Sequence, residues 1–283
     1  MNIFDSAVFQ KSLYTFLKYC VLAFLVLFAV TTIFPFVYSI VLSTHDREGI
    51  SSIGMSLLPG IDWVTNYDLL LARIDFWRGI SNSAITSILG TVFSILFCSM
   101  CGYALAVYKF KGRNVMFGIM MLSMMIPPVL SLIPYFLIVD QMGLTNTLFA
   151  VWIPFTIAPM GIFLVRQYVV ASIPKDLLEA AKLDGAGEFR IYSTIVMPLL
   201  KPSLATLAII QFVFLWNNFM QPLVILEGDK MVIITMIRSL QGTPTTPMGA
   251  VILGSFLSML PLIVVFVVAS KQMISGLTSG AVK

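Results

Sequence analysis

Residues 79–108 read GISNSAITSILGTVFSILFCSMCGYALAVY and contain no Asp, Glu, Lys or Arg. A helix of about 20 apolar residues crosses the hydrocarbon core of a bilayer. Five other stretches of at least 25 residues also lack these four residue types, namely 19–45, 114–139, 141–165, 202–226 and 239–270. The sequence therefore predicts an all-α polytopic membrane protein with six transmembrane helices.

The composition is that of a membrane protein. Hydrophobic residues make up 59% of the 283 positions, charged residues make up 11%, and the mean hydropathy is +0.97. A soluble domain carries about a quarter charged residues and a disordered chain has low hydrophobicity, so both classes are excluded. The first apolar run is too long for the core of a signal peptide, and we expect it to be retained. We expect one membrane domain over 19–270, an N-terminal segment over 1–18 and a C-terminal tail over 271–283.

Lys and Arg are distributed unequally between the two sides of the predicted spans. If the N-terminus is cytoplasmic, the cytoplasmic segments hold 12 of the 17 Lys and Arg residues, including three in the short loop 109–113. Cytoplasmic loops of membrane proteins are rich in these residues. Both termini are therefore expected in the cytoplasm, with an outer loop at about 46–78 and a large cytoplasmic loop at about 167–200.

The sequence contains no motif for catalysis or metal binding. It lacks a G-x-x-x-x-G-K-[ST] phosphate loop, a G-x-S-x-G elbow and an H-E-x-x-H metal motif. No charged residue lies in the middle of a span, where ion-coupled pumps usually need one. Cys20, Cys98 and Cys101 lie inside spans, so a packing role is favoured over a disulfide, metal or redox role. We expect no catalytic residue, metal, cofactor or nucleic-acid partner, and an energy source outside this chain.

The large cytoplasmic loop has the pattern of two helices joined by a glycine turn. Ser172 and Pro174 resemble a helix start, and every residue from Lys175 to Asp184 tolerates a helix. Gly185 and Gly187 then supply a flexible stop. A second amphipathic run follows, which Pro198 is expected to close.

The first of these helices has one face made of small and apolar residues. Pro174, Leu178, Ala181 and Gly185 align on this face, which allows close approach by another surface. Glu179 lies between lysines at i−4 and i+3, so its charge is locally balanced. Periodicity alone leaves two roles open, a helix lying flat against lipid headgroups and a helix that docks a protein.

The same loop carries a spacing that resembles a known family. Glu179-Ala180-Ala181, three residues, Gly185, nine residues, Ile195, one residue, Met197 and Pro198 resemble the E-A-A-x3-G-x9-I-x-L-P signature of the membrane subunits of binding-protein-dependent ABC importers. The departure is Met197 in place of Leu, a volume-conserving exchange. The likeness extends over almost the whole chain and is strongest to the carbohydrate-type branch (maltose and glycerol-phosphate permeases) and its shorter, six-span partner. Further matching segments are Ile173-Pro174, Asp184-Gly185-Ala186, Pro198-Leu199-x-Lys201-Pro202, Trp216-Asn217-x-Phe219, Pro222-Leu223, Asn82-Ser83 and the ending Gly276–Lys283.

The resemblance implies a subunit of a larger assembly in the cytoplasmic (inner) membrane of a prokaryote. Two membrane subunits would form the pathway, two ATPase subunits would bind ATP and Mg beneath it, and an extracytoplasmic solute-binding protein would deliver a sugar. The cytoplasmic coupling helix between spans 4 and 5 would dock on an ATPase subunit. The residues implied in this coupling are Leu178, Glu179, Ala180, Ala181, Asp184, Gly185, Ile195 and Pro198.

Polar residues concentrate in the fifth run, and they are candidates for the substrate path. These residues are Gln211, Trp216, Asn217, Asn218 and Gln221. Hydrogen bonding between helices, which polar residues in spans commonly provide, is the favoured alternative to sugar contact. Other open alternatives for the whole chain are an importer of a polyol, sugar phosphate or peptide, and a membrane scaffold that moves nothing.

Prolines within the third and fourth runs predict kinks in those helices. They stand at Pro127, Pro128, Pro134, Pro154 and Pro159. Such kinks are equally compatible with a role in gating and with static bends of the helices.

Overall fold

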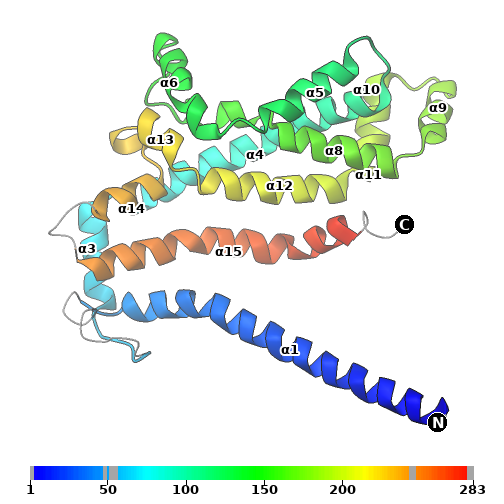
Figure 1. The fold of residues 1–283 in the computed structure, drawn as a ribbon. Coiled ribbons are helices and arrows are strands. Elements are labelled where there is room, and N and C mark those ends of the chain that lie inside the picture. The colour runs from blue at the N-terminus through cyan, green and yellow to red at the C-terminus, as the bar shows by residue number, and fades with distance from the viewer. Residues whose placement is uncertain (1–2, 47–49, 51–56, 242–246, 279–283) are drawn as a thin grey trace. The chain divides into compact units, whose positions relative to one another are not determined.

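The long apolar runs form helices in the computed structural model, which describes residues 3–46, 50, 57–241 and 247–278. All regular secondary structure in these residues is helical (Figure 1), so the predicted all-α class is confirmed for them. Four helical segments are long and apolar enough to cross a membrane, namely Ser12–Leu42 within α1 (Ile3–Leu42), α4 (Phe76–Val107), Leu148–Ser172 and Met248–Ala269 within α15 (Met248–Thr278).

Two further segments are long and apolar enough only if a sharp bend is included. The first joins α5 (Arg113–Ser123) to η1 (Pro128–Ser131) and α6 (Leu132–Gln141) at 97°. The second joins Glu188–Leu199 to α12 (Lys201–Trp216) at 76°. Pro127 and Pro128 stand at the first break, where the missing proline N–H groups prevent a continuous helix, as the sequence predicts. Each bent pair, counted as one span, raises the number of candidate spans to six.

Three predicted runs have internal breaks that a count of charges does not show. The fourth run is divided into α7 (Leu148–Trp152), η2 (Ile153–Phe155) and α8 (Pro159–Ser172). The fifth is divided into α12 and α13 (Met220–Ile225). The sixth begins within α14 (Ile233–Gln241) and continues in α15, and residues 242–246 between them lie outside the described residues.

The chain divides into two compact units, and the first comprises Met1–Arg73 and Thr243–Leu257. Here α1 continues without a break past Lys18, the expected boundary of the N-terminal segment, and the side chains of residues 12–37 are exposed. The buried Asn66 of α3 (Trp63–Arg73) donates 2.9 Å hydrogen bonds to the main-chain oxygens of Ser43 and His45, tying α3 to the end of α1.

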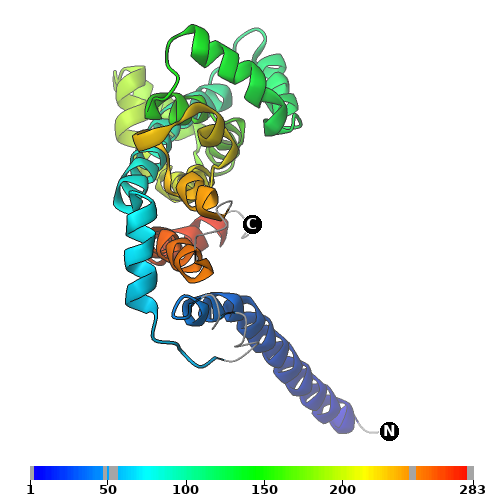
Figure 2. The ribbon, with the colours of Figure 1, turned by 90° about the vertical axis from the view of Figure 1, so that its left-hand side faces the viewer.

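The second unit comprises Ile74–Gly242 and Ser258–Lys283. In it α4 packs against both α8 and α12, which also contact each other (Figure 1; Figure 2). Glycines permit the close approach, because a Cβ at Gly102 would lie 2.8 Å from Val165 Cβ and one at Gly161 would lie 3.0 Å from Cys98 Sγ. Cys98 is fully buried at this contact, which agrees with a packing role. The tail is helical to Thr278, and the last five residues of the matched ending, 279–283, lie outside the described residues.

Candidate functional site

The predicted loop helix is present as α9 (Lys175–Leu183). The expected start is corrected, because Ser172 is the last residue of α8 and Pro174 occupies the N-cap without a side-chain cap. The helix ends in a left-handed turn at Gly185, whose φ is +76°. The N–H of Ala186 donates a 3.0 Å hydrogen bond to the oxygen of Ala181, which closes the turn in the manner of a Schellman motif. The predicted glycine stop is confirmed.

The two faces of α9 differ from the sequence-based interpretation. Leu178 is 5% exposed and Ala181 is 8% exposed, and both pack in the core of this chain with Ile191 and Tyr192. The middle of the small face therefore meets the chain's own helices, whereas Pro174 and Gly185 at its two ends are exposed. The exposed residues of α9 and its C-cap are Lys175, Asp176, Leu177, Glu179, Ala180, Lys182, Leu183 and Asp184. Leu183, at 90% exposed, is the most open apolar side chain among them.

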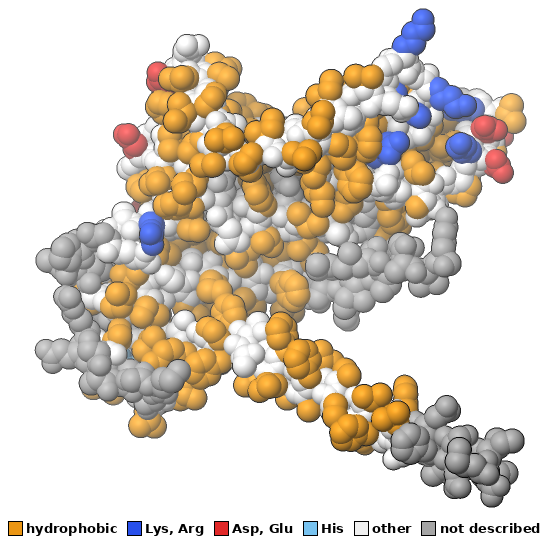
Figure 3. Space-filling model, viewed as in Figure 1, with side chains coloured by type: hydrophobic (Ala, Val, Ile, Leu, Met, Phe, Trp, Pro, Cys, Tyr) orange, Lys and Arg blue, Asp and Glu red, His pale blue; other side chains and the backbone are white. Residues whose placement is uncertain are grey.

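The second helix of the loop is composite. It consists of α10 (Glu188–Arg190), the π-helix η3 (Ile191–Val196) and α11 (Met197–Leu199). Pro198 lies inside α11 and does not close the helix as expected. Ile195 is half-buried and packs against the core, whereas Pro198 is exposed. Lys and Arg side chains gather over the region of α5, α9 and α10 in Figure 3.

The polar residues proposed for the substrate path are mostly engaged by the chain itself. Side-chain N–H groups of buried residues donate to main-chain oxygens of other elements: Gln211 to Phe155 at 3.0 Å, Trp216 to Ser258 at 3.1 Å and Gln221 to Ala150 at 3.2 Å. Asn218 donates to the side-chain oxygen of Gln221 at 2.9 Å. Asn217 is exposed and donates within its own helix, to Val213. This geometry favours the interhelical alternative for Gln211, Trp216 and Gln221, whereas Asn217 and Asn218 donate to residues four and three positions away.

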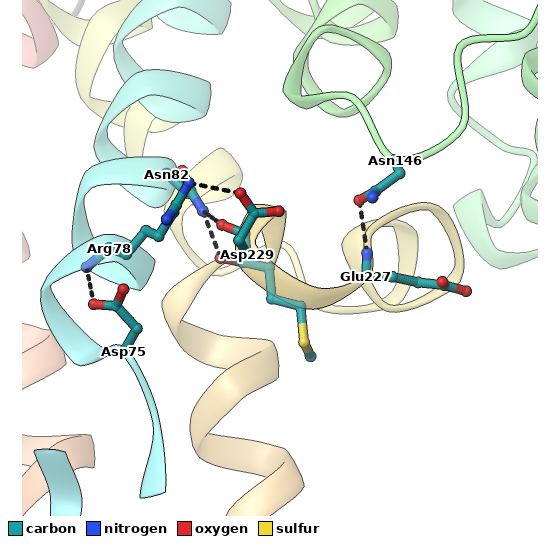
Figure 4. Close-up of polar contacts among 7 residues, drawn as sticks. Asp75, Arg78, Asn82, Asn146, Glu227 and Asp229 are labelled. Atoms are coloured by element: carbon teal, nitrogen blue, oxygen red, sulfur yellow. Dashed lines mark hydrogen bonds and ion pairs between the residues drawn. The ribbon is translucent and has the colours of Figure 1, made fainter. Parts of the chain in front are cut away.

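At the N-terminal end of α4, polar contacts hold the segment 227–233 (Figure 4). Asn82 Nδ2 donates to the main-chain oxygens of Asp229 and Met231, and the Ile233 N–H donates to Ser83 Oγ, all at 2.9 Å. Arg78 also pairs with the Asp229 carboxylate at 2.6 Å. Nothing in the residue pattern predicts this arrangement beyond the family match at Asn82-Ser83.

The sequence of the chain also matches a known family. Residues 95–272 match the family described as "Binding-protein-dependent transport system inner membrane component". The chain belongs to this family. The resemblance inferred from the spacing between Glu179 and Pro198 is confirmed, and the chain is an inner membrane component.

Two relatives cover nearly the whole chain. The arabinooligosaccharides transport system permease protein AraQ of Halalkalibacterium halodurans is 36% identical over 262 residues, covering 90% of this chain and 92% of the relative. The lactose transport system permease protein LacG of Rhizobium radiobacter is 30% identical over 279 residues, covering 97% of this chain and 98% of the relative.

The fold of this family member is also similar to a solved structure. A chain of a bacterial ABC transporter involved in the import of the acidic polysaccharide alginate matches with a TM-score of 0.76 and 24% identity. The match covers 93% of this chain and 97% of that one. At this identity the likeness supports the fold alone.

Proposed function

We propose that this chain is the membrane-spanning permease subunit of an ATP-driven importer for a sugar or oligosaccharide. The observation that carries the proposal is the near-complete coverage of permeases named for arabinooligosaccharides and lactose. The six spans would comprise the four long helices and the apolar parts of the two bent pairs, with Glu188–Leu199 remaining in the cytoplasmic loop. An importer of another solute is the alternative.

The partners follow from the family. A second permease subunit would complete the pathway, and an extracytoplasmic solute-binding protein would deliver the sugar. Two further subunits would bind ATP and Mg and supply the hydrolysis, so this chain would itself be non-catalytic. Both termini and the loop that holds α9 would face the cytoplasm.

The exposed face of α9 would dock on one ATPase subunit. Glu179 offers a carboxylate and Leu183 an apolar side chain, and the neighbouring Ala180 leaves room for close approach. When the ATPase subunits close, the docked helices would move together and turn the gate, a rigid-body change between two states. Leu178 and Ala181 would transmit this movement from inside, through their contacts with the core.

Reconstitution of the assembly in lipid vesicles tests the proposal. We expect the sugar-loaded binding protein to stimulate ATP hydrolysis and sugar uptake, with the unloaded binding protein as the control. Glu179→Lys reverses a charge that docking would bury and should abolish both responses, because removing one partner of a buried charge pair at an interface costs about 2–5 kcal/mol. The proposal would be refuted if the rate of ATP hydrolysis changed neither with the loaded binding protein nor with the Glu179→Lys substitution.

A further inference from the structure

Three side chains join the turn after α9 to the end of α4, and we call them the Glu188 clamp: Tyr108, Lys182 and Glu188. The Lys182 ammonium lies 2.6 Å from Glu188 Oε1. The Tyr108 hydroxyl donates a 2.5 Å hydrogen bond to Glu188 Oε2. The same ammonium stands 5.6 Å from the centre of the Tyr108 ring. Each carboxylate oxygen is therefore held by a different segment of the chain.

The three residues stand at the ends of helices. Tyr108 is the C-cap of α4, and its N–H donates to the oxygen of Ala104. Lys182 lies in the last turn of α9, and Glu188 is the first residue of α10. Between Lys182 and Glu188 the backbone passes through the left-handed turn at Gly185. The clamp thus bridges the turn at Gly185 and attaches it to the long apolar helix α4.

A second contact lies deeper in the same unit. The Tyr192 hydroxyl of η3 is 2.7 Å from Ser99 Oγ of α4, and both residues are buried. Tyr103 fills the space between the two contacts, because its ring centre is 5.8 Å from that of Tyr108 and 5.6 Å from that of Tyr192. Short π-helical segments such as η3 are frequent at functional sites.

An exposed ion pair alone would be a weak link, since such pairs contribute little to stability. The Lys182 and Glu188 side chains are 44% and 53% exposed. Their ion pair differs from an isolated one because the Tyr108 hydroxyl fixes the second carboxylate oxygen and belongs to α4. Hydrogen bonds from Lys182 and Tyr108 also hold the pKa of Glu188 below its usual range, which keeps the carboxylate ionised.

We propose that Glu188 is a positioning residue that makes α9 and α4 move together, so that a displacement of the coupling helix reaches the transmembrane core. This inference rests on the proposed function. Without the clamp, the turn at Gly185 would absorb part of the displacement. The ATPase-facing side of α9 would remain unchanged, because none of its exposed docking residues, Glu179, Ala180 and Leu183, belongs to the clamp.

The test measures ATP hydrolysis and sugar uptake in the same reconstituted assembly. Glu188→Gln removes the charge, and Tyr108→Phe removes only the hydroxyl that reaches the carboxylate. We expect both variants to assemble with the ATPase subunits and to retain hydrolysis stimulated by the loaded binding protein. Sugar taken up per ATP should fall by about fivefold or more, the lower end of typical coupling between sites.

The chain offers a matched control at the other end of α4. The Arg78–Asp229 pair has the same 2.6 Å separation and similar exposure, 48% and 51%. Asp229→Asn should leave uptake per ATP at the wild-type value. The proposal is overturned if the two clamp variants keep the wild-type uptake of sugar per ATP, or if this uptake falls equally in Asp229→Asn. It is also overturned if Glu188→Gln prevents assembly with the ATPase subunits. Failure of the proposed function is distinct, because the wild-type assembly would then show no stimulation by the binding protein.

Discussion

The side-chain amide of Asn82 donates a 2.9 Å hydrogen bond to the main-chain oxygen of Asp229, 147 residues further along the chain. The same nitrogen donates to the oxygen of Met231. Because Asn82 is only 7% exposed, these two oxygens serve as partners for its buried side-chain amide. One side chain thereby fixes the path of η4 (Gly228–Lys230) against the start of α4.

Replacing Asn82 with Ala should therefore lower stability. The change removes two hydrogen bonds between α4 and the segment 227–233, and each lost bond costs about 0.5–1.5 kcal/mol. Arg78→Met is the control, since it removes an exposed ion pair to the same segment and should cost about 1 kcal/mol or less. Thermal unfolding of the purified protein in detergent measures both. Equal losses in the two variants would contradict the role given to Asn82.

Replacing Gly185 with Ala should destabilise the turn after α9. A left-handed conformation costs an L-residue about 1–2 kcal/mol, and the φ of Gly185 is +76°. Gly187 is the matched control, because its φ is −68° and a Cβ there has no atom within 4 Å. Protease cleavage rates within the loop should rise for Gly185→Ala and stay unchanged for Gly187→Ala. Similar rates for the two variants would show that the turn tolerates a side chain.

The Glu188 clamp should respond to acid. Hydrogen bonds from Lys182 and Tyr108 lower the pKa of Glu188, so its contribution to folding is present above the usual carboxylate range and is lost as the pH falls through the lowered value. The pKa of Lys182 is raised mainly by Glu188, with smaller contributions from Tyr103 and Glu179, so its contribution is lost only in strong alkali. The difference in melting temperature between wild type and Glu188→Gln should shrink from about pH 6 to about pH 3. A difference that stays constant over this range would contradict the pairing.

Gln211 should act as a structural residue. Its side chain is buried and donates to the oxygen of Phe155, and hydrogen bonds between spans contribute about 1 kcal/mol. Gln211→Leu should lower the melting temperature and leave the KM for sugar uptake unchanged. The exposed Asn217 is the comparison, because Asn217→Ala removes only a bond within its own helix. A raised KM for sugar uptake in Gln211→Leu, with an unchanged melting temperature, would instead support a role for Gln211 in contacting the substrate.

Much of the architecture follows from local sequence. Long charge-free runs such as 79–108 predict helices that can cross a bilayer, because length and apolar composition alone meet that requirement. The break at Pro127-Pro128 and the turn at Gly185 are equally local, since each depends on the backbone chemistry of one or two residues. The spacing from Glu179 to Pro198 points to the family that residues 95–272 match.

The tertiary structure decides which helix faces are buried within the chain and which remain exposed for contact with a partner. The helical pattern of α9 places Leu178 and Ala181 on one face, and only packing against Ile191 shows that this face points inward. The division of the fifth run after Trp216 is likewise invisible to a count of charges. Glu188 and Tyr108 meet across 80 residues of chain, and Asn82 and Asp229 meet across 147. Sequence determines conformation where neighbours along the chain set the energy, whereas these pairs form only once separate helices have packed together.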